Sequence, residues 1–156
     1  NGTPSSRRSP RTEEAVTAAV VLDTMVVTAL INKVKRPEAA ARYLAIIDGR
    51  PRVLSFASVS ELRYGAMKAG WGEFRQRGLE RDLDEYTVIK PSDEILTSCA
   101  EMRWAARQRG HALSQKVHDS DRWIAATAVH LDLDLISEDR VFRDFPGLRL
   151  VRPGES

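Results

Sequence analysis

The sequence has little cysteine and histidine, the residue types that form disulfides and zinc sites. Its 156 residues include one cysteine, Cys99, and three histidines. A single cysteine excludes a disulfide within the chain, and this set is too small for a credible zinc site. Cys99 lies in a helical pattern and is expected to be a small core residue. A lone thiol is typical of a reducing compartment, so we expect a cytoplasmic protein in which any metal is held by oxygen ligands.

Long apolar runs are also missing. No stretch approaches the roughly 18 apolar residues that cross a bilayer, and the first residues lack the apolar segment of a signal peptide. We therefore expect neither membrane insertion nor export.

An excess of charge of one sign is missing too. With 24 Lys and Arg residues and 22 Asp and Glu residues, the formal net charge is +2. A net charge of this size does not by itself indicate a nucleic-acid partner.

What the chain does have is the composition of one ordinary folded domain. Hydrophobic residues make up 42% of it and charged residues 29%, and its length is enough to bury a substantial core. Residues 1–17 are rich in Ser, Pro, Arg and Glu and are expected to be a disordered tail. The folded domain is expected over residues 18–152, with a short tail at 153–156.

Short apolar runs alternate with helical patterns along this domain. Ala19 to Leu22 is a continuous apolar run that stops at Asp23, as in a strand buried on both faces of a parallel sheet. Residues 111–117 are expected to form a loop. Strands that alternate with helices predict an α/β fold with a mostly parallel sheet covered on both faces. Further strands are expected at 53–57, 86–89, 133–136 and 148–151, and helices at 26–32, 37–49, 58–69, 73–85, 92–110 and about 119–131.

Four acidic residues lie where this fold would bring them together. Asp23 directly follows the first strand, and Glu61 and Asp139 lie a few residues beyond the second and fourth. Asp121 opens the helix that leads into the fourth strand. Open parallel sheets bind their ligands beyond the carboxyl ends of the strands. Four carboxylates there would repel one another unless a cation joined them, and oxygen-rich sites favour Mg²⁺ or Mn²⁺.

Two of these acids also have purely structural explanations. Ser58-Val59-Ser60-Glu61 has the spacing of a capping box, in which Glu61 would bond back to the Ser58 amide. Asp121 would lie in the first turn of its helix, where the helix dipole favours an acid, with Asp119 or Ser120 as the N-cap. From the residues alone, capping and metal binding both stay open for Glu61 and Asp121.

Four segments, taken together, resemble the motifs of PIN-domain ribonucleases, and most closely those of VapC-type toxins of bacterial toxin–antitoxin pairs. The resemblance covers about residues 19–151 and ends in a Phe-Pro-Gly-Leu-Arg stretch typical of such toxins. The most specific motif is the Asp-x-x-Ile-Ala-Ala-Thr-Ala stretch. The segments are Val20-Val21-Leu22-Asp23-Thr24, Ser58-Val59-Ser60-Glu61-Leu62, Asp121-Arg122-Trp123-Ile124-Ala125-Ala126-Thr127-Ala128 and Leu135-Ile136-Ser137-Glu138-Asp139.

The resemblance implies a three-layer α/β/α fold and Mg²⁺-dependent hydrolysis of RNA phosphodiester bonds, with Mn²⁺ as a substitute. It also implies a homodimer that a small cognate antitoxin inhibits. Ser137 corresponds to a hydroxyl residue near the family's last acid. The acids that would hold the metal and carry the catalysis map to Asp23, Glu61, Asp121 and Asp139.

Residues next to these acids are further candidates. Thr24 and Asp119 join Ser137 as candidate outer-shell residues. Asp119 also makes the third acid ambiguous, although the offset of Asp121 from Ile-Ala-Ala fits the motif better. Met25 departs from the family, which usually has a small Ser or Asn there. It would either narrow the entrance to the site or belong to the core. Three basic residues close to the acids in sequence are candidate contacts to the RNA backbone: Arg63, Lys116 and Arg140. Each is also explained as an ordinary surface charge.

Two other functions are compatible with an aspartate after the first strand. Receiver and haloacid-dehalogenase domains use such an aspartate in phosphoryl transfer. The phosphatase pattern needs a second aspartate where Met25 stands, and the early acid pair and late lysine of a receiver are not evident. The second alternative is a non-catalytic RNA- or protein-binding module on the same fold. Such a module would gain nothing from acids that repel phosphate.

Overall fold

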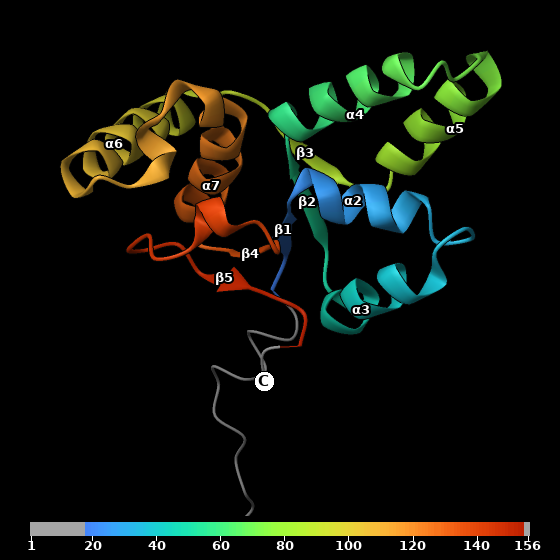
Figure 1. The fold of residues 1–156 in the computed structure, drawn as a ribbon, viewed down its shortest axis with the longest axis horizontal. Coiled ribbons are helices and arrows are strands. Elements are labelled where there is room, and N and C mark those ends of the chain that lie inside the picture. The colour runs from blue at the N-terminus through green and yellow to red at the C-terminus, as the bar shows by residue number, and fades with distance from the viewer. Residues whose placement is uncertain (1–17, 155–156) are drawn as a thin grey trace, which may run out of the picture.

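A parallel sheet of short strands forms the centre of the protein (Figure 1). The computed structural model describes residues 18–154, so the tail expected at 1–17 lies outside the described residues. The strands lie in the order β3-β2-β1-β4-β5, and every neighbouring pair is parallel. They are β1 (Val20–Leu22), β2 (Arg52–Ser55), β3 (Thr87–Ile89), β4 (Asp134–Ile136) and β5 (Leu150–Val151).

The side chains of β1 alternate between two hydrophobic cores. Val20 and Leu22 pack in one core and Val21 in the other, because successive residues of a strand point to opposite faces of the sheet. The first core is covered by α2 (Thr24–Ile31), α3 (Pro37–Ile47), α4 (Phe56–Lys68) and α5 (Glu73–Leu83). The second is covered by α6 (Asp93–Arg109) and α7 (Asp119–Leu131). This three-layer α/β/α arrangement confirms the predicted fold class.

The chain completes one half of the sheet before it begins the other. From β1 it continues outward through β2 to β3, and then returns to β4 on the other side of β1. Ligands of open α/β sheets bind where the strand order reverses in this way. Here that point lies beyond the carboxyl ends of β1 and β4. Asp23 directly follows the first of these ends, and Asp139 lies three residues after the second.

Helix α4 begins earlier than the sequence predicts. The expected strand at 53–57 ends at Ser55, and Phe56 and Ala57 already belong to the helix. Ser55 is the N-cap, because its hydroxyl accepts a hydrogen bond from the Ala57 N–H at 3.2 Å. The chain therefore passes from strand to helix without a loop.

Helix α7 also begins differently. His118 occupies the N-cap position, and no side chain caps the helix, so the expectation of Asp119 or Ser120 as the N-cap is wrong. The expected loop at 111–117 consists mainly of two 3₁₀ turns, η1 (Ala112–Ser114) and η2 (Lys116–His118), and the second runs directly into α7. A third turn, η3 (Arg140–Phe142), follows β4.

The described residues agree with two simpler expectations. Cys99 is a buried residue of α6. No helix among residues 18–154 has both the length and the apolar character needed to cross a bilayer.

Candidate active site

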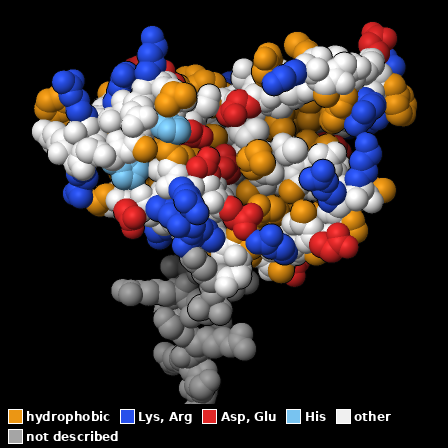
Figure 2. Space-filling view, viewed as in Figure 1, with side chains coloured by type: hydrophobic (Ala, Val, Ile, Leu, Met, Phe, Trp, Pro, Cys, Tyr) orange, Lys and Arg blue, Asp and Glu red, His pale blue; other side chains and the backbone are white. Residues whose placement is uncertain are grey.

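The four predicted acids lie around the point where the strand order reverses. Figure 2 shows acidic side chains gathered in the middle of this face, between the α6–α7 half and the α4–α5 half of the molecule. Burial raises the pKa of Asp23, and the charges of Asp121 and Asp139 raise it further. Burial also raises the pKa of Glu61, and the charges of Asp121 and Asp23 add to that rise. The acids are therefore close enough to disfavour one another's ionised form.

Asp23 is the most buried of the four, with 5% of its surface exposed. It caps α2: its Oδ1 accepts a hydrogen bond from the Thr24 N–H at 2.8 Å, and its Oδ2 accepts one from the Ser137 hydroxyl at 2.7 Å. Both bonds favour the carboxylate, but burial outweighs them and raises the pKa of Asp23 from 3.8 to about 6. A nearby cation would stabilise the ionised form of this group.

Ser137 connects the segments that follow β1 and β4. It is fully buried, and its hydroxyl donates to Asp23 and accepts a hydrogen bond from the Asp139 N–H at 3.0 Å. The Asp139 carboxylate in turn accepts from the Val141 N–H at 3.0 Å and caps η3. One hydroxyl thus holds two of the predicted acids in a fixed relation.

Glu61 does not form the predicted capping box. Because α4 begins at Phe56, Ser58 is the third residue of the helix and Glu61 the sixth. The Ser58 hydroxyl is buried and lies 3.0 Å from the Thr24 Oγ1, and the same Oγ1 lies 3.2 Å from Glu61 Oε1. The capping explanation for Glu61 is therefore wrong. Its carboxylate instead reaches the first residue of α2, next to Asp23.

A histidine that neither the residue patterns nor the family resemblance indicated lies beside Asp121. The Nδ1 of His118 is 2.8 Å from the Oδ2 of Asp121, and both side chains are about three-quarters buried. Burial raises the pKa of Asp121, and the hydrogen bond to His118 opposes that rise. The signal in the sequence is a histidine three residues before an acid in the first turn of a helix.

Arg122, in the first turn of α7, was also missed. Its guanidinium is buried, with 3% of the residue exposed, and it pairs with the Asp119 carboxylate. It also donates to the Leu113 carbonyl at 2.5 Å. The extra acid of the motif therefore neutralises a buried arginine in this structure. An outer-shell metal role for Asp119 stays a prediction.

Comparison with known proteins agrees with this geometry. The sequence matches the PIN domain over residues 20–148. The chain belongs to the PIN-domain family. No curated protein sequence matches it, but several solved structures share the fold of this PIN domain.

Chains from VapBC and toxin–antitoxin structures are among these neighbours, as the resemblance predicts. A chain of VapBC2 from Rickettsia felis, bound to promoter DNA, has a TM-score of 0.71 and 22% identity over 86% of this chain and 98% of its own length. A chain of a Klebsiella pneumoniae toxin–antitoxin complex has a TM-score of 0.62 and 26% identity over 88% and 100%. A chain of FitAcB from Neisseria gonorrhoeae has a TM-score of 0.65 and 21% identity over 84% and 95%.

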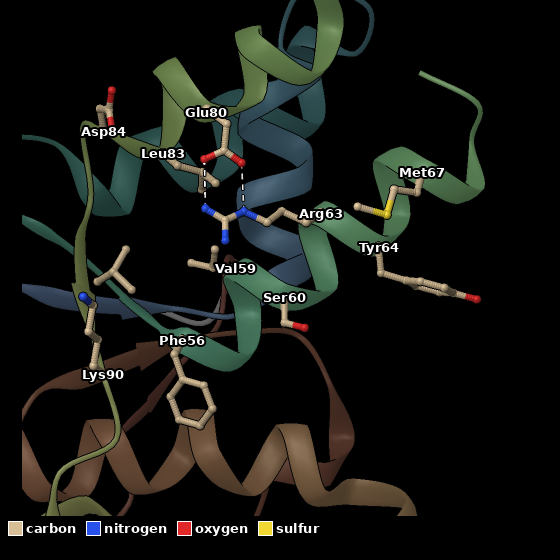
Figure 3. A pocket seen from close by; sticks show the side chains of 11 residues that line it. Phe56, Val59, Ser60, Arg63, Tyr64, Met67, Glu80, Leu83, Asp84 and Lys90 are labelled. Carbon is tan, nitrogen blue, oxygen red and sulfur yellow. Dashed lines mark hydrogen bonds and ion pairs between the residues drawn. The ribbon is translucent and has the colours of Figure 1, made fainter. Parts of the chain in front are cut away.

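The three basic candidates of the PIN domain have different surroundings. Lys116 in η2 and Arg140 in η3 are exposed on turns that adjoin the acids in sequence. Arg63 borders a hollow of about 650 Å³ between α4 and α5, where its Nε and Nη2 donate to the two carboxylate oxygens of Glu80 at 2.8 and 3.0 Å (Figure 3). To bind RNA, Arg63 would have to leave Glu80, and RNA contacts of all three residues stay predictions. Met25, where the family usually has a small residue, is 70% exposed and is not a core residue.

The donor chemistry of the site fits an oxygen-seeking divalent cation. Within residues 18–154, neither Lys nor Arg forms an ion pair with Asp23, Glu61 or Asp139. A bound cation would stabilise the ionised form of Asp23, whose pKa is raised mainly by burial and further by the charges of Asp121 and Asp139. Among the same residues, no three His, Cys, Asp or Glu side chains are grouped closely enough to hold an ion as they stand. The fit therefore rests on the kind and number of donors, and coordination would require at least one of the carboxylates to move towards the others.

Proposed function

We propose that this PIN-domain protein is a Mg²⁺-dependent ribonuclease and the toxin of a toxin–antitoxin pair. The observation that carries the proposal is the convergence of Asp23, Glu61, Asp121 and Asp139 where the strand order reverses. Burial raises the pKa of Asp23, Glu61 and Asp121, and the charges of neighbouring acids raise each of them further. Membership of the PIN family and the likeness to chains of toxin–antitoxin complexes support the same function. Mn²⁺ is expected to replace Mg²⁺ because both prefer oxygen ligands.

The protein's part in this reaction is to hold and orient charge. The bound cation would supply an activated water and neutralise charge on the scissile phosphate. Asp23 and Asp121 would be direct ligands, with Asp139 beside them and Glu61 acting through a water or a second ion. Ser137 would keep the Asp23 carboxylate in one orientation through its 2.7 Å hydrogen bond.

The substrate would be RNA with exposed, unpaired nucleotides. Side chains cannot read the deep, narrow groove of an A-form helix, so enzymes of this size usually recognise single-stranded loops and ends. Lys116 and Arg140, which lie close to the acids in sequence, would contact the phosphate backbone. Their removal should weaken RNA binding in a salt-dependent way.

The proposed partners are a small cognate antitoxin and a second copy of this chain. Asp23, Glu61 and Asp139, which pair with no Lys or Arg among residues 18–154, would attract a basic side chain of the antitoxin. If an antitoxin segment covers the acids, its binding should weaken the affinity for Mn²⁺ measured by calorimetry, by reciprocal linkage. An unchanged affinity would place the antitoxin elsewhere. The homodimer is tested by light scattering after gel filtration.

The decisive experiment compares RNA cleavage by Asp121→Asn and by a matched control, Asp144→Asn. Asp144 is exposed and lies at φ 59°, a conformation that asparagine tolerates, so this control makes the same charge change outside the site. Asp121→Asn should lose at least roughly tenfold in rate while its melting temperature stays equal or rises. The control should keep both values. Cleavage that persists undiminished in excess EDTA would overturn the metal mechanism, and covalent labelling of Asp23 by a phosphate mimic would favour phosphoryl transfer instead.

A further inference from the structure

His118 lies between the acidic site and the irregular segment that precedes α7. Its Nδ1 is 2.8 Å from Asp121 Oδ2, and its backbone N–H donates to the Gln115 carbonyl at 3.0 Å. The side chain is 29% exposed and that of Asp121 is 24% exposed, so much of the surrounding water is excluded from this hydrogen bond. A contact of this kind orients a carboxylate that otherwise turns about its χ angles.

The position of His118 is itself fixed by Arg122. The Nη1 of Arg122 donates to the carbonyls of Leu113 at 2.5 Å and Gln115 at 3.4 Å. It therefore holds η1 and the Gln115 carbonyl, which also accepts from the His118 N–H. Leu113 is fully buried in the core beneath α6 and α7. The ion pair with Asp119 ties the same guanidinium to the first turn of α7. The segment that carries His118 therefore has little freedom to move relative to Asp121.

The two histidines of this segment require different tautomers. The Nδ1 of His111 accepts a hydrogen bond from the Leu113 N–H at 3.1 Å, so its Nε2 carries the hydrogen that meets the Arg143 carbonyl at 2.7 Å. For His118 the situation is reversed, because an ionised carboxylate only accepts hydrogen bonds. The nitrogen that faces Asp121 must therefore be an Nδ1–H.

We propose that His118 is a positioning residue of the acidic site, whose Nδ1–H holds the Asp121 carboxylate in the orientation in which it binds the metal ion. The proposal rests on the proposed function, because it takes Asp121 as a metal ligand. His118 does not touch the reacting atoms in this role. It acts through Asp121, as the hydrogen-bond partners of ligand side chains do in other metal sites. Losing such a partner typically lowers metal affinity or activity by roughly 10- to 100-fold.

Three substitutions separate this role from others. His118→Asn places an amide N–H where Nδ1 lies, His118→Gln places one near the position of Nε2, and His118→Leu provides neither. We expect His118→Asn to bind Mn²⁺ within about threefold of the unmodified protein. His118→Gln and His118→Leu should bind it at least roughly tenfold more weakly. In the cleavage assay, kcat should follow the same order while KM for RNA changes little.

Each other pattern overturns the proposal. If His118→Gln keeps activity and His118→Asn loses it, Nε2 acts on the RNA and the contact with Asp121 is incidental. If all three variants bind Mn²⁺ like the unmodified protein, Asp121 needs no such partner. Should His118→Leu fail to fold, the comparison of the Asn and Gln variants, which are both polar, still decides between these outcomes.

The ring tautomer provides a readout that requires neither metal nor RNA. Long-range ¹H–¹⁵N NMR spectra in mildly alkaline buffer should show His118 as the Nδ1–H form, with His111 as an internal reference in the Nε2–H form. An Nε2–H form for His118 would overturn the proposal. Failure of the proposed function is distinguishable, because the unmodified protein would then bind no Mn²⁺ and cleave no RNA, whatever the tautomer.

Discussion

Replacing Asp23 with asparagine should stabilise the metal-free protein at neutral pH. Burial raises the pKa of Asp23 from 3.8 to about 6, so the folded state favours the protonated form. Each unit of difference between the folded and unfolded pKa is worth about 1.4 kcal/mol. Ionising the Asp23 carboxylate therefore costs the folded state about 3 kcal/mol above pH 6. The folded protein keeps the Asp23 proton to a higher pH than the unfolded chain does. The free energy of unfolding therefore falls as the pH rises from about 4 through about 6.

Part of this gain is offset by lost hydrogen bonding. The two oxygens of Asp23 accept from the Ser137 hydroxyl and the Thr24 N–H, and asparagine keeps only one of these acceptors. Losing one such bond costs about 1 to 2 kcal/mol. The expected net gain is therefore about 1 to 2 kcal/mol, or roughly 2 to 8 °C in melting temperature for a domain of this size.

The measurement is thermal unfolding followed by circular dichroism, in EDTA, between about pH 4 and pH 7. Relative to the unmodified protein, Asp23→Asn should be most stable near pH 7. Its advantage should fall towards pH 4, where the cost of ionising Asp23 is nearly gone and the lost hydrogen bond leaves the variant slightly less stable. Added Mg²⁺ should raise the melting temperature of the unmodified protein more than that of the variant. Asp144→Asn is the matched control. A variant that melts below the unmodified protein by the same amount at both pH values would refute the reasoning, because the charge would then carry no cost.

Three further substitutions test individual contacts. Glu61→Gln should melt within a few degrees of the unmodified protein but cleave RNA at least roughly tenfold more slowly, about 1.4 kcal/mol of transition-state stabilisation. Glu101→Gln, on an exposed face of α6, is its control, and equal rates for the two would remove Glu61 from the site. Ser137→Ala leaves buried polar groups without their partner and should lower the free energy of unfolding by about 1 to 3 kcal/mol in urea titrations; an unchanged midpoint would contradict that contact. Asp119→Asn leaves the Arg122 charge buried and unpaired, and should cost about 2 kcal/mol, below the value for a fully buried pair because Asp119 is half exposed.

The position of the acids could be predicted because it depends on strand periodicity and topology, which are visible in the sequence. Val20 to Leu22 is continuously apolar because both faces of β1 are buried, and the run ends at the residue that reaches the edge of the sheet. The partner of Glu61 could not be predicted in this way. Ser55 and Ser58 are both plausible N-caps, and the choice between them depends on where β2 ends. Pairing of Ser55 with Ile89 in β3 extends the strand to that serine, and this is a tertiary contact.

The groups that hold the predicted acids differ in charge from those that hold acids elsewhere in the protein. Glu80 is held by Arg63, and this hydrogen bond and charge lower the pKa of Glu80, so that it needs no further cation. Asp23 and Glu61 are held by hydroxyl groups, which orient a carboxylate without neutralising it, and the pKa of each is raised. The two hydroxyls belong to Ser137 and Thr24. Hydroxyl donors therefore orient Asp23 and Glu61 while leaving their negative charge for a cation to neutralise. An arginine in place of these hydroxyls would stabilise the metal-free protein and lower its affinity for the metal ion.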